Sequence, residues 1–372
     1  MKRLASLLVC ATAVSLWQSQ AQSKELTVGN YLPPSHYSTV HGLVPLAEAV
    51  KKETNGSLTF KLFAGGQLYN AQRSLSGIGN RLSDGGLVVP LFARSDLRHA
   101  ILATDLVFST SNPLVAAAAS TEMILLRCPE CQNDYKKTGS LFLAGYSTTN
   151  YTLMCKPDVK SIADVKGKKI RSVGSQGQLA KEMGGVPVSM PMTEAVEAMQ
   201  RNAIDCIIGP FSWLTAYPGT DEVVKHVVDY PFGLSSGIAL FVMNRQSWSA
   251  LEPAHKKAII KSLPGAIAEV MVVGTFGDLK RAEEAAKKRG ITIVKGGKEF
   301  ADLVARFRKK EDSAVIARAG KLGVKNAQSI ADRYFETTAK WEKIMQKIGD
   351  DKAAFAKALQ DEIYSKLDVN KL

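Results

Sequence analysis

The sequence predicts a two-lobed α/β fold, in which two mixed or parallel sheets are flanked by helices and enclose a cleft between the lobes. Runs rich in β-branched and aromatic residues alternate with amphipathic runs, a pattern typical of sheets covered by helices. The 372 residues are enough for two separate cores. Strand-like segments on either side of residue 150 indicate where the chain leaves one lobe and enters the other.

The N-terminus has the composition of a secretory signal peptide. Lys2 and Arg3 precede a short apolar run, and Ser19 and Ala21 are small residues at the −3 and −1 positions of a cleavage site. Residues 1–21 are therefore expected to be removed and the mature protein to be exported. No later segment is expected to be long and apolar enough to cross a bilayer.

The first lobe is expected to begin with alternating strands and helices. Turn residues bound each segment, and apolar residues repeat with the period of a strand or a helix. The predicted strands are 26–31, 58–63, 86–91 and 141–148, and the predicted helices are 40–53, 68–78 and 112–127. Ligands bind at the carboxyl ends of strands in open α/β sheets, so these ends are expected to face the cleft.

The second lobe is expected to open with a strand at 152–155 and a short helix. Ser161 and Asp164 have capping-box spacing at the start of that helix, and Gly167 ends it. Strands at 169–173, 186–190 and 203–208 then alternate with helices at 176–183 and 193–200. A strand at 237–243 is expected to return to the first lobe.

Helices dominate the remaining chain. A long helical region follows Pro253 and runs toward Arg289, with Pro264 expected to kink or break it. A short strand at 290–294 and several helical pieces complete the chain. We therefore assign residues 22–146 and about 236–280 to the first lobe, and residues 147–235 and about 281–372 to the second lobe with the C-terminal helices.

Four cysteines follow the leader, and an exported protein can oxidise them. Cys128 and Cys131 have CxxC spacing. A local structural disulfide is the favoured interpretation, because the pair follows a predicted helix and no second CxxC or nearby histidine supports zinc. Cys155 and Cys206 lie on strands of one predicted lobe, where they either pair or remain buried thiols.

The net charge is basic, +13 for the whole chain and +11 once Lys2 and Arg3 are removed. The lysines are spread over predicted helices, without zinc-finger spacing or a basic stripe with interleaved aromatic residues, so nucleic acid is not an expected partner. The basic surface is expected to be solvated and to steer anions toward the cleft.

Three stretches resemble a known family: KSIADVKGKKIRS at 160–172, GGVPVSMPMTEAVEAMQRNAIDC at 184–206, and the opening segment at 31–68. Together they resemble the DctP-like solute-binding proteins of tripartite ATP-independent periplasmic (TRAP) transporters. The resemblance implies a Venus-flytrap periplasmic binding protein that captures a small organic acid anion. It also implies that the partners are small and large membrane permease subunits and that the protein docks only peripherally at the membrane.

Arg171 is the leading candidate for ligand binding. The resemblance implies that it is the family's carboxylate-binding arginine, and its planar fork can donate two parallel hydrogen bonds to a carboxylate without losing its charge. A surface arginine at a strand end is the alternative.

Gly209 and Pro210 fall where the family usually has Asn-Pro, so the resemblance does not identify the ligand. Trp213 follows closely, either as an aromatic lining for a ligand with an apolar or ring-bearing body or as ordinary packing. Further candidates lie in turns after strands and at the crossings between lobes, where packing or solvent exposure is the alternative for each: His36, Tyr37, Gln67, Phe92, Tyr151 and Phe232.

No catalytic, metal-binding or cofactor-binding motif is present in the sequence, and the chain is not expected to be an enzyme. Three other functions stay open. The chain could serve a different transporter class or a sensor kinase, act as an exported thiol oxidoreductase through Cys128 and Cys131, or be an exported protein that binds a polyanion.

Overall fold

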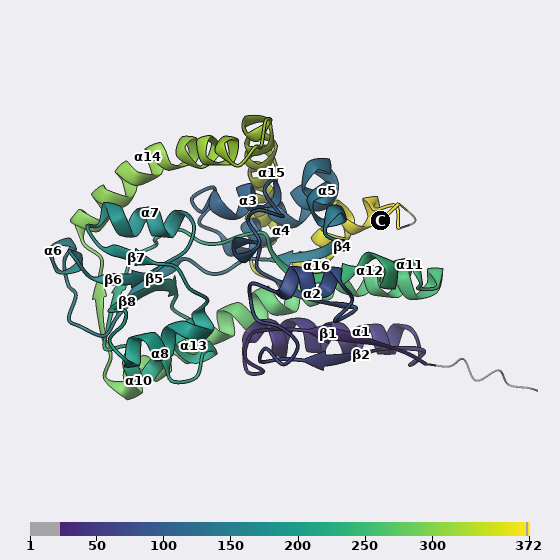
Figure 1. Cartoon of the computed structure of the whole chain (residues 1–372), viewed down its shortest axis with the longest axis horizontal. Coiled ribbons are helices and arrows are strands. Elements are labelled where there is room, and N and C mark those ends of the chain that lie inside the picture. The colour runs from purple at the N-terminus through teal and green to yellow at the C-terminus, as the bar shows by residue number, and fades with distance from the viewer. Residues whose placement is uncertain (1–22, 370) are drawn as a thin grey trace, which may run out of the picture.

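A computed structural model describes residues 23–369, 371 and 372, so the predicted signal peptide lies outside the described residues. Two mixed sheets, each flanked by helices, form two lobes that lie side by side (Figure 1). This architecture confirms the predicted fold class.

The first sheet has the strand order β2-β1-β3-β10-β4. β1 pairs in parallel with β2 and β3, whereas β10 is antiparallel to both of its neighbours. The strands are β1 (Lys24–Gly29), β2 (Leu58–Phe63), β3 (Gly85–Val88), β4 (Ser140–Tyr146) and β10 (Ile238–Asn244). The returning strand expected at 237–243 is thus an interior strand of the first sheet.

The second sheet has the strand order β11-β9-β5-β8-β6-β7. β5 is antiparallel to β8 and β9, and the other pairs are parallel. The strands are β5 (Tyr151–Cys155), β6 (Lys169–Arg171), β7 (Val186–Val188), β8 (Cys206–Pro210), β9 (His226–Asp229) and β11 (Thr292–Lys295). β9 was not predicted, because a four-residue strand has too few residues to show a period.

The helices of the first lobe begin at clear start signals. The side chain of Asn112 accepts hydrogen bonds from the backbone N–H groups of Leu114 and Val115, and Pro113 occupies the first turn of α4. The helices are α1 (Val44–Glu53), α2 (Ser74–Gly79), α3 (Ala100–Asp105), α4 (Pro113–Glu122), α5 (Pro129–Lys137) and α11 (Arg245–Ser249). Two π-helical segments, η1 (Thr39–Leu43) and η3 (Met123–Arg127), and the 3₁₀ segment η2 (Pro90–Phe92) accompany them.

The second lobe carries short helices between its strands. Asp164 accepts a hydrogen bond of 2.9 Å from the backbone N–H of Ser161, as the capping-box spacing predicts, and Gly167 follows the helix at φ 74°. The helices are α6 (Ile162–Val165), α7 (Ser175–Glu182), α8 (Met192–Gln200), α9 (Trp213–Ala216) and α10 (Thr220–Val223).

One unbroken helical path connects the two lobes. It consists of α12 (Pro253–Ala268), the π-helical segment η4 (Glu269–Thr275) and α13 (Phe276–Arg289). α12 contacts α1 and β4 of the first lobe, and α13 contacts α9 and α10 of the second. Pro264 therefore does not break the helix, and the expected kink there stays a prediction. Pro264 lies within α12 beside Leu263 and Ala266, and burial of all three against the core offsets the one hydrogen bond that proline cannot make.

We also expected no later segment to be long and apolar enough to cross a membrane, but one helix meets this criterion by length and composition. The helix from Pro253 to Arg289 contains an 18-residue window of mean hydropathy 1.5. However, 61% of that window is buried inside the protein, as in a core helix of a soluble protein. Length and composition are thus only weak evidence for a span.

The C-terminal helices are shared between the lobes rather than belonging to the second. α14 (Lys298–Lys321) buries Phe300 and Phe307 in the second core, and its later turns contact α3 and α15 of the first lobe. α15 (Ala327–Ile348) packs on α4, and α16 (Lys352–Glu362) packs on α12 and is followed by the short 3₁₀ segment η5 (Tyr364–Lys366). The assignment of residues 281–372 to the second lobe therefore fails for α15 and α16, whose amphipathic sequences do not reveal which lobe they cover (Figure 1).

Both possible disulfides are present. Cys128 bonds Cys131, and Cys155 bonds Cys206 across β5 and β8. Cys128 is the N-cap of α5, and its Sγ accepts the backbone N–H of Cys131 at 3.1 Å. The CxxC pair thus opens a helix, contrary to the sequence-based interpretation, but the two residues are only 1% and 2% exposed.

Candidate functional site

The chain crossing that follows β4 pairs with the one that precedes β10. Thr148 exchanges hydrogen bonds with Ser235, since Thr148 N–H donates to the Ser235 carbonyl at 2.9 Å and Ser235 N–H donates to Thr148 Oγ1 at 3.0 Å. The N–H of Tyr151 donates to the carbonyl of Gly233 at 2.7 Å. This paired hinge forms one wall of a cavity.

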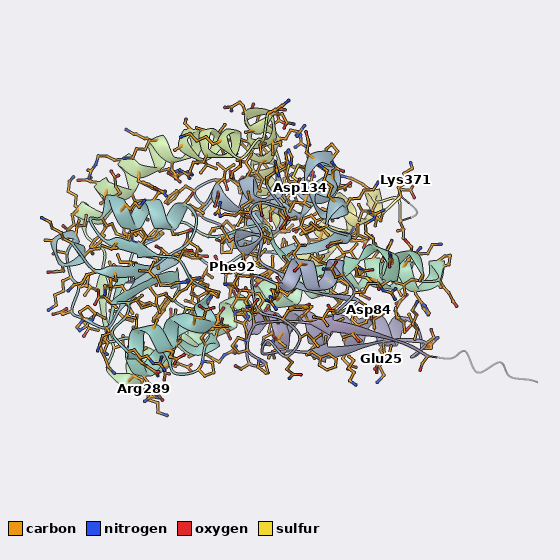
Figure 2. The ribbon with its side chains drawn as sticks, in the orientation of Figure 1. Glu25, Asp84, Phe92, Asp134, Arg289 and Lys371 are labelled. Carbon is orange, nitrogen blue, oxygen red and sulfur yellow. A yellow bond between two sulfur atoms is a disulfide. The ribbon has the colours of Figure 1, made fainter. Side chains whose placement is uncertain are left out.

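The cavity lies between the lobes and has a volume of about 50 Å³. Side chains from both lobes and from the hinge line it. The polar and aromatic ones are Tyr31, His36, Tyr37, Phe92, Tyr146, Thr148, Tyr151, Arg171, Trp213, Tyr217 and Ser235. Figure 2 shows the labelled Phe92 in the region between the two sheets.

Arg171 enters the cavity from the last position of β6, which lies between β7 and β8. Its Nε donates to the carbonyl of Met190 at 2.9 Å, which fixes the plane of the guanidinium. The guanidinium carbon is 5.2 Å from the centre of the Trp213 ring, within cation–π range. Arg171 is only 2% exposed, so the cation is held in a protein interior.

The charge of Arg171 is not balanced by the protein. Across the described residues, no carboxylate lies within ion-pair distance of it, and its Nη1 is buried without a hydrogen-bond partner. Burial lowers the pKa of Arg171, and the nearby hydroxyls of Tyr151, Tyr217 and Tyr31 act in the opposite direction. A buried cation without a counterion is costly, and an anionic ligand at this position would remove that cost.

Five tyrosines line the cavity together with Arg171, and three of them, Tyr31, Tyr151 and Tyr217, lie near its guanidinium. Burial raises the pKa of Tyr31, Tyr37, Tyr146, Tyr151 and Tyr217, so their hydroxyls stay protonated and neutral. They come from both lobes, and each hydroxyl can donate one hydrogen bond and accept others. The site therefore combines one fixed positive charge with several neutral hydrogen-bonding groups.

His36 adds a further neutral group. Its Nδ1 accepts the backbone N–H of Ser38 at 3.1 Å and lies 2.8 Å from Ser38 Oγ. An acceptor Nδ1 leaves the ring proton of the neutral imidazole on Nε2. Burial lowers the pKa of His36 to about 3, so the ring carries no charge at neutral pH.

Six of the ten predicted site residues line this cavity: His36, Tyr37, Phe92, Tyr151, Arg171 and Trp213. The other four lie elsewhere. Gln67 is exposed, and Phe232 is buried against the rings of Tyr230 and Phe300 in the second core. Gly209 and Pro210 end β8, where Pro210 is opposite Tyr151, and Gly209 supports the ring of Trp213 from behind.

Sequence reasoning missed several contributors to the cavity, including Tyr31, Met192 and Tyr217. Tyr217 lies four residues after Trp213, a spacing that places both on one side of a helical turn, and their ring centres are 5.6 Å apart. That spacing was a usable signal. Tyr31 follows a strand, and Met192 begins a helix. At neither position does a sequence pattern distinguish a ligand contact from core packing.

No group of three or more His, Cys, Asp or Glu residues in the described part of the chain is placed to hold a metal ion. The cavity chemistry thus rests on Arg171, the tyrosines and His36.

A protein-family comparison matches residues 28–303 to the bacterial extracellular solute-binding proteins of family 7. Solved structures of similar fold include a TRAP periplasmic solute-binding protein from Bordetella bronchiseptica with bound (R)- and (S)-mandelate. It is 20% identical, the match covers 85% of this chain and 99% of that chain, and the TM-score is 0.72.

Two further structures share the fold. A TRAP solute-binding protein from Rhodoferax ferrireducens with copurified benzoate is 19% identical, with 87% and 99% of the two chains covered and a TM-score of 0.76. One from Desulfovibrio salexigens with bound orotic acid is 20% identical, with 85% and 99% covered and a TM-score of 0.73. At these identities the structures establish the fold.

Proposed function

The chain belongs to the bacterial extracellular solute-binding proteins of family 7, and we propose that it is the periplasmic receptor of a TRAP transporter. In this proposal it binds a small organic acid between its lobes through the carboxylate, with Arg171 as the clamp, and delivers it to the small and large permease subunits. The leader at residues 1–21 would direct its export.

One observation carries the proposal: Arg171 is a buried cation whose Nη1 has no hydrogen-bond partner among residues 23–369, 371 and 372. The structures of similar fold were solved with mandelate, benzoate and orotic acid, all carboxylic acids, which supports the same ligand class for this chain. A bidentate carboxylate fits the planar guanidinium edge and neutralises it.

Binding and closure would be coupled. Arg171 and Trp213 reside in the second lobe, and Tyr31 and Tyr37 in the first, so a ligand touching both sets stabilises the shut arrangement over an open one. The function would then depend on the difference in ligand affinity between the closed and the open conformation, and no covalent bond would be made or broken.

The family is one of solute-binding proteins rather than enzymes. The burial of Cys128 and Cys131 also argues against thiol exchange, because a substrate disulfide could not reach either sulfur.

The test is calorimetric titration of the mature protein with a panel of organic acids, each paired with its uncharged primary amide. An acid should bind and raise the melting temperature, because it binds the native state alone, whereas its amide should not. Failure of every acid, or equal binding of an acid and its amide, would reject the carboxylate receptor. Transport by vesicles containing the permease subunits, with and without this protein, tests delivery.

A further inference from the structure

We propose that the cognate ligand carries a single negative charge, as a monocarboxylate whose remaining groups are uncharged. This inference rests on the proposed function, because it specifies the ligand class of the same cavity.

The first argument is the charge of the cavity wall. Among the described side chains that line it, Arg171 alone carries a formal charge, and the others are apolar or neutral hydrogen-bonding groups. A monoanion leaves the closed cavity electrically neutral. A dianion would bring one charge more than the wall can balance, into an interior where uncompensated charge is costly.

The second argument is the capacity of Arg171 itself. Its Nε already donates to the Met190 carbonyl, and the Trp213 ring lies over the guanidinium. The free donors are therefore those of the terminal edge, including the buried and unpartnered Nη1. That edge accommodates one carboxylate through two parallel hydrogen bonds.

The third argument is that, in the part of the chain that the structure describes, no other cationic group near the cavity is free to pair with a ligand. His36 uses Nδ1 as an acceptor for the Ser38 N–H, a geometry that requires an unprotonated nitrogen. Arg94, near the cleft side of the second lobe at Gly174, is held by both oxygens of Asp105 at 2.7 and 2.8 Å. A second carboxylate would therefore have to break an existing ion pair.

The neutral groups define what the rest of the ligand can contain. No described protein group hydrogen-bonds the hydroxyl of Tyr31 or Tyr217, although both lie near Arg171. These hydroxyls can meet a hydroxyl or carbonyl oxygen on the ligand without demanding a charge. A second ionised group would receive hydrogen bonds from them but no countercharge.

The experiment compares matched acids that differ by one carboxylate. Calorimetric titrations would use butyrate against succinate, lactate against malate, and benzoate against phthalate. The better member of each pair should be the monocarboxylate, by at least about 100-fold in Kd, since an uncompensated buried charge costs that much or more. Equal or tighter binding of the dicarboxylates would overturn the inference and leave the carboxylate receptor standing. If neither series binds, the receptor assignment fails and the inference with it.

A gain-of-function variant supplies an independent readout. Phe92 lines the cavity from the first lobe and is half-buried, so a lysine can replace it with its stem against the wall. Phe92→Lys should reduce the ratio of the dicarboxylate Kd to the monocarboxylate Kd by at least 10-fold. Phe92→Leu, which adds no charge, should leave this ratio unchanged. An unchanged preference in folded Phe92→Lys would show that wall charge does not select the ligand and would count against the inference.

Discussion

The ring of Trp213 lies directly over Gly209, so close that a Cβ atom on residue 209 would be 2.3 Å from Cε3 and 2.4 Å from Cζ3 of the ring. The same ring also contacts Arg171, whose guanidinium carbon is 5.2 Å from the ring centre. The missing side chain at 209 is therefore a condition for the position of Trp213, and Trp213 in turn orients the cation.

We expect Gly209→Ala to displace Trp213 and lower the free energy of unfolding by about 1–3 kcal/mol, as overpacking of a core does. Ligand affinity should fall with it, because Arg171 loses its aromatic support. Denaturant unfolding and calorimetry measure both effects. Gly265→Ala is the control, since a Cβ there meets nothing within 4 Å inside a helix and alanine favours helix. Unaltered ligand affinity in Gly209→Ala would contradict the claim that Trp213 must support Arg171 for binding.

Replacing the buried cation should separate binding from stability. Arg171→Met is expected to weaken binding of the cognate acid by about 100-fold or more, the loss typical of removing one partner of a buried charge pair. The melting temperature of the free protein should stay the same or rise, because methionine removes a desolvated charge that has no counterion. A large drop in the melting temperature would instead mark Arg171 as a structural residue.

The interlobe contact beside Gly174 offers a test of closure. Gly174 has φ 58°, and a Cβ there would lie 2.7 Å from Asp105 Oδ1 and 2.9 Å from Arg94 Nη2 in the first lobe. Gly174→Ala should therefore hold the lobes apart and weaken ligand binding by at least 10-fold.

Small-angle scattering of the ligand-saturated variant should give a larger radius of gyration than the wild type. Gly167→Ala is the comparison, since Gly167 has φ 74° but no neighbour within 4 Å, so it adds backbone strain without an interlobe clash. Equal affinity losses in the two variants would mean that strain alone explains the effect.

His36 makes stability depend on pH. Its pKa is lowered to about 3 in the folded protein, below the value of about 6.5 for an unfolded chain. Between these values the unfolded state binds the extra proton, so stability falls as the pH falls, by up to about 1.4 kcal/mol per unit, and is fully present above pH 6.5. His36→Asn keeps an acceptor for the Ser38 N–H but does not titrate. Urea unfolding at pH 4.5, 5.5 and 7 should give a shallower slope for this variant, and identical slopes would contradict the assignment.

The two disulfides should contribute unequally. Cys155 and Cys206 are 51 residues apart, whereas Cys128 and Cys131 are three apart. Loop-closure entropy predicts a loss of about 4 kcal/mol for the Cys155→Ala/Cys206→Ala double variant and about 2 kcal/mol for Cys128→Ala/Cys131→Ala. All four residues are buried, which makes the second pair a matched control. An equal loss would show that packing, rather than chain entropy, dominates.

The sequence predicted the parts of this protein that depend on local pattern. The KGKKIR run placed Arg171 on a strand predicted at 169–173, whereas the strand in the structure ends at Arg171. The alternation of strands and helices predicted two helix-flanked sheets. Tyr31 could not be predicted as a cavity residue, because it meets Tyr146 and Tyr217 only after β1, β4 and α9 have packed. The lobe that α15 and α16 cover was equally inaccessible, since an amphipathic face shows that a helix is covered but not by what.

The helix that runs without a break from Pro253 to Arg289 has a mechanical implication. Each end is embedded in a different lobe, so an opening of the lobes would bend or twist this helix as well as the paired hinge segments. The π-helical segment η4 (Glu269–Thr275) lies between the two anchored ends, and π-helical turns within α-helices are frequent at functional sites. We therefore expect any opening of the lobes to be concentrated at η4, the segment between the parts of the helix that are anchored in each lobe.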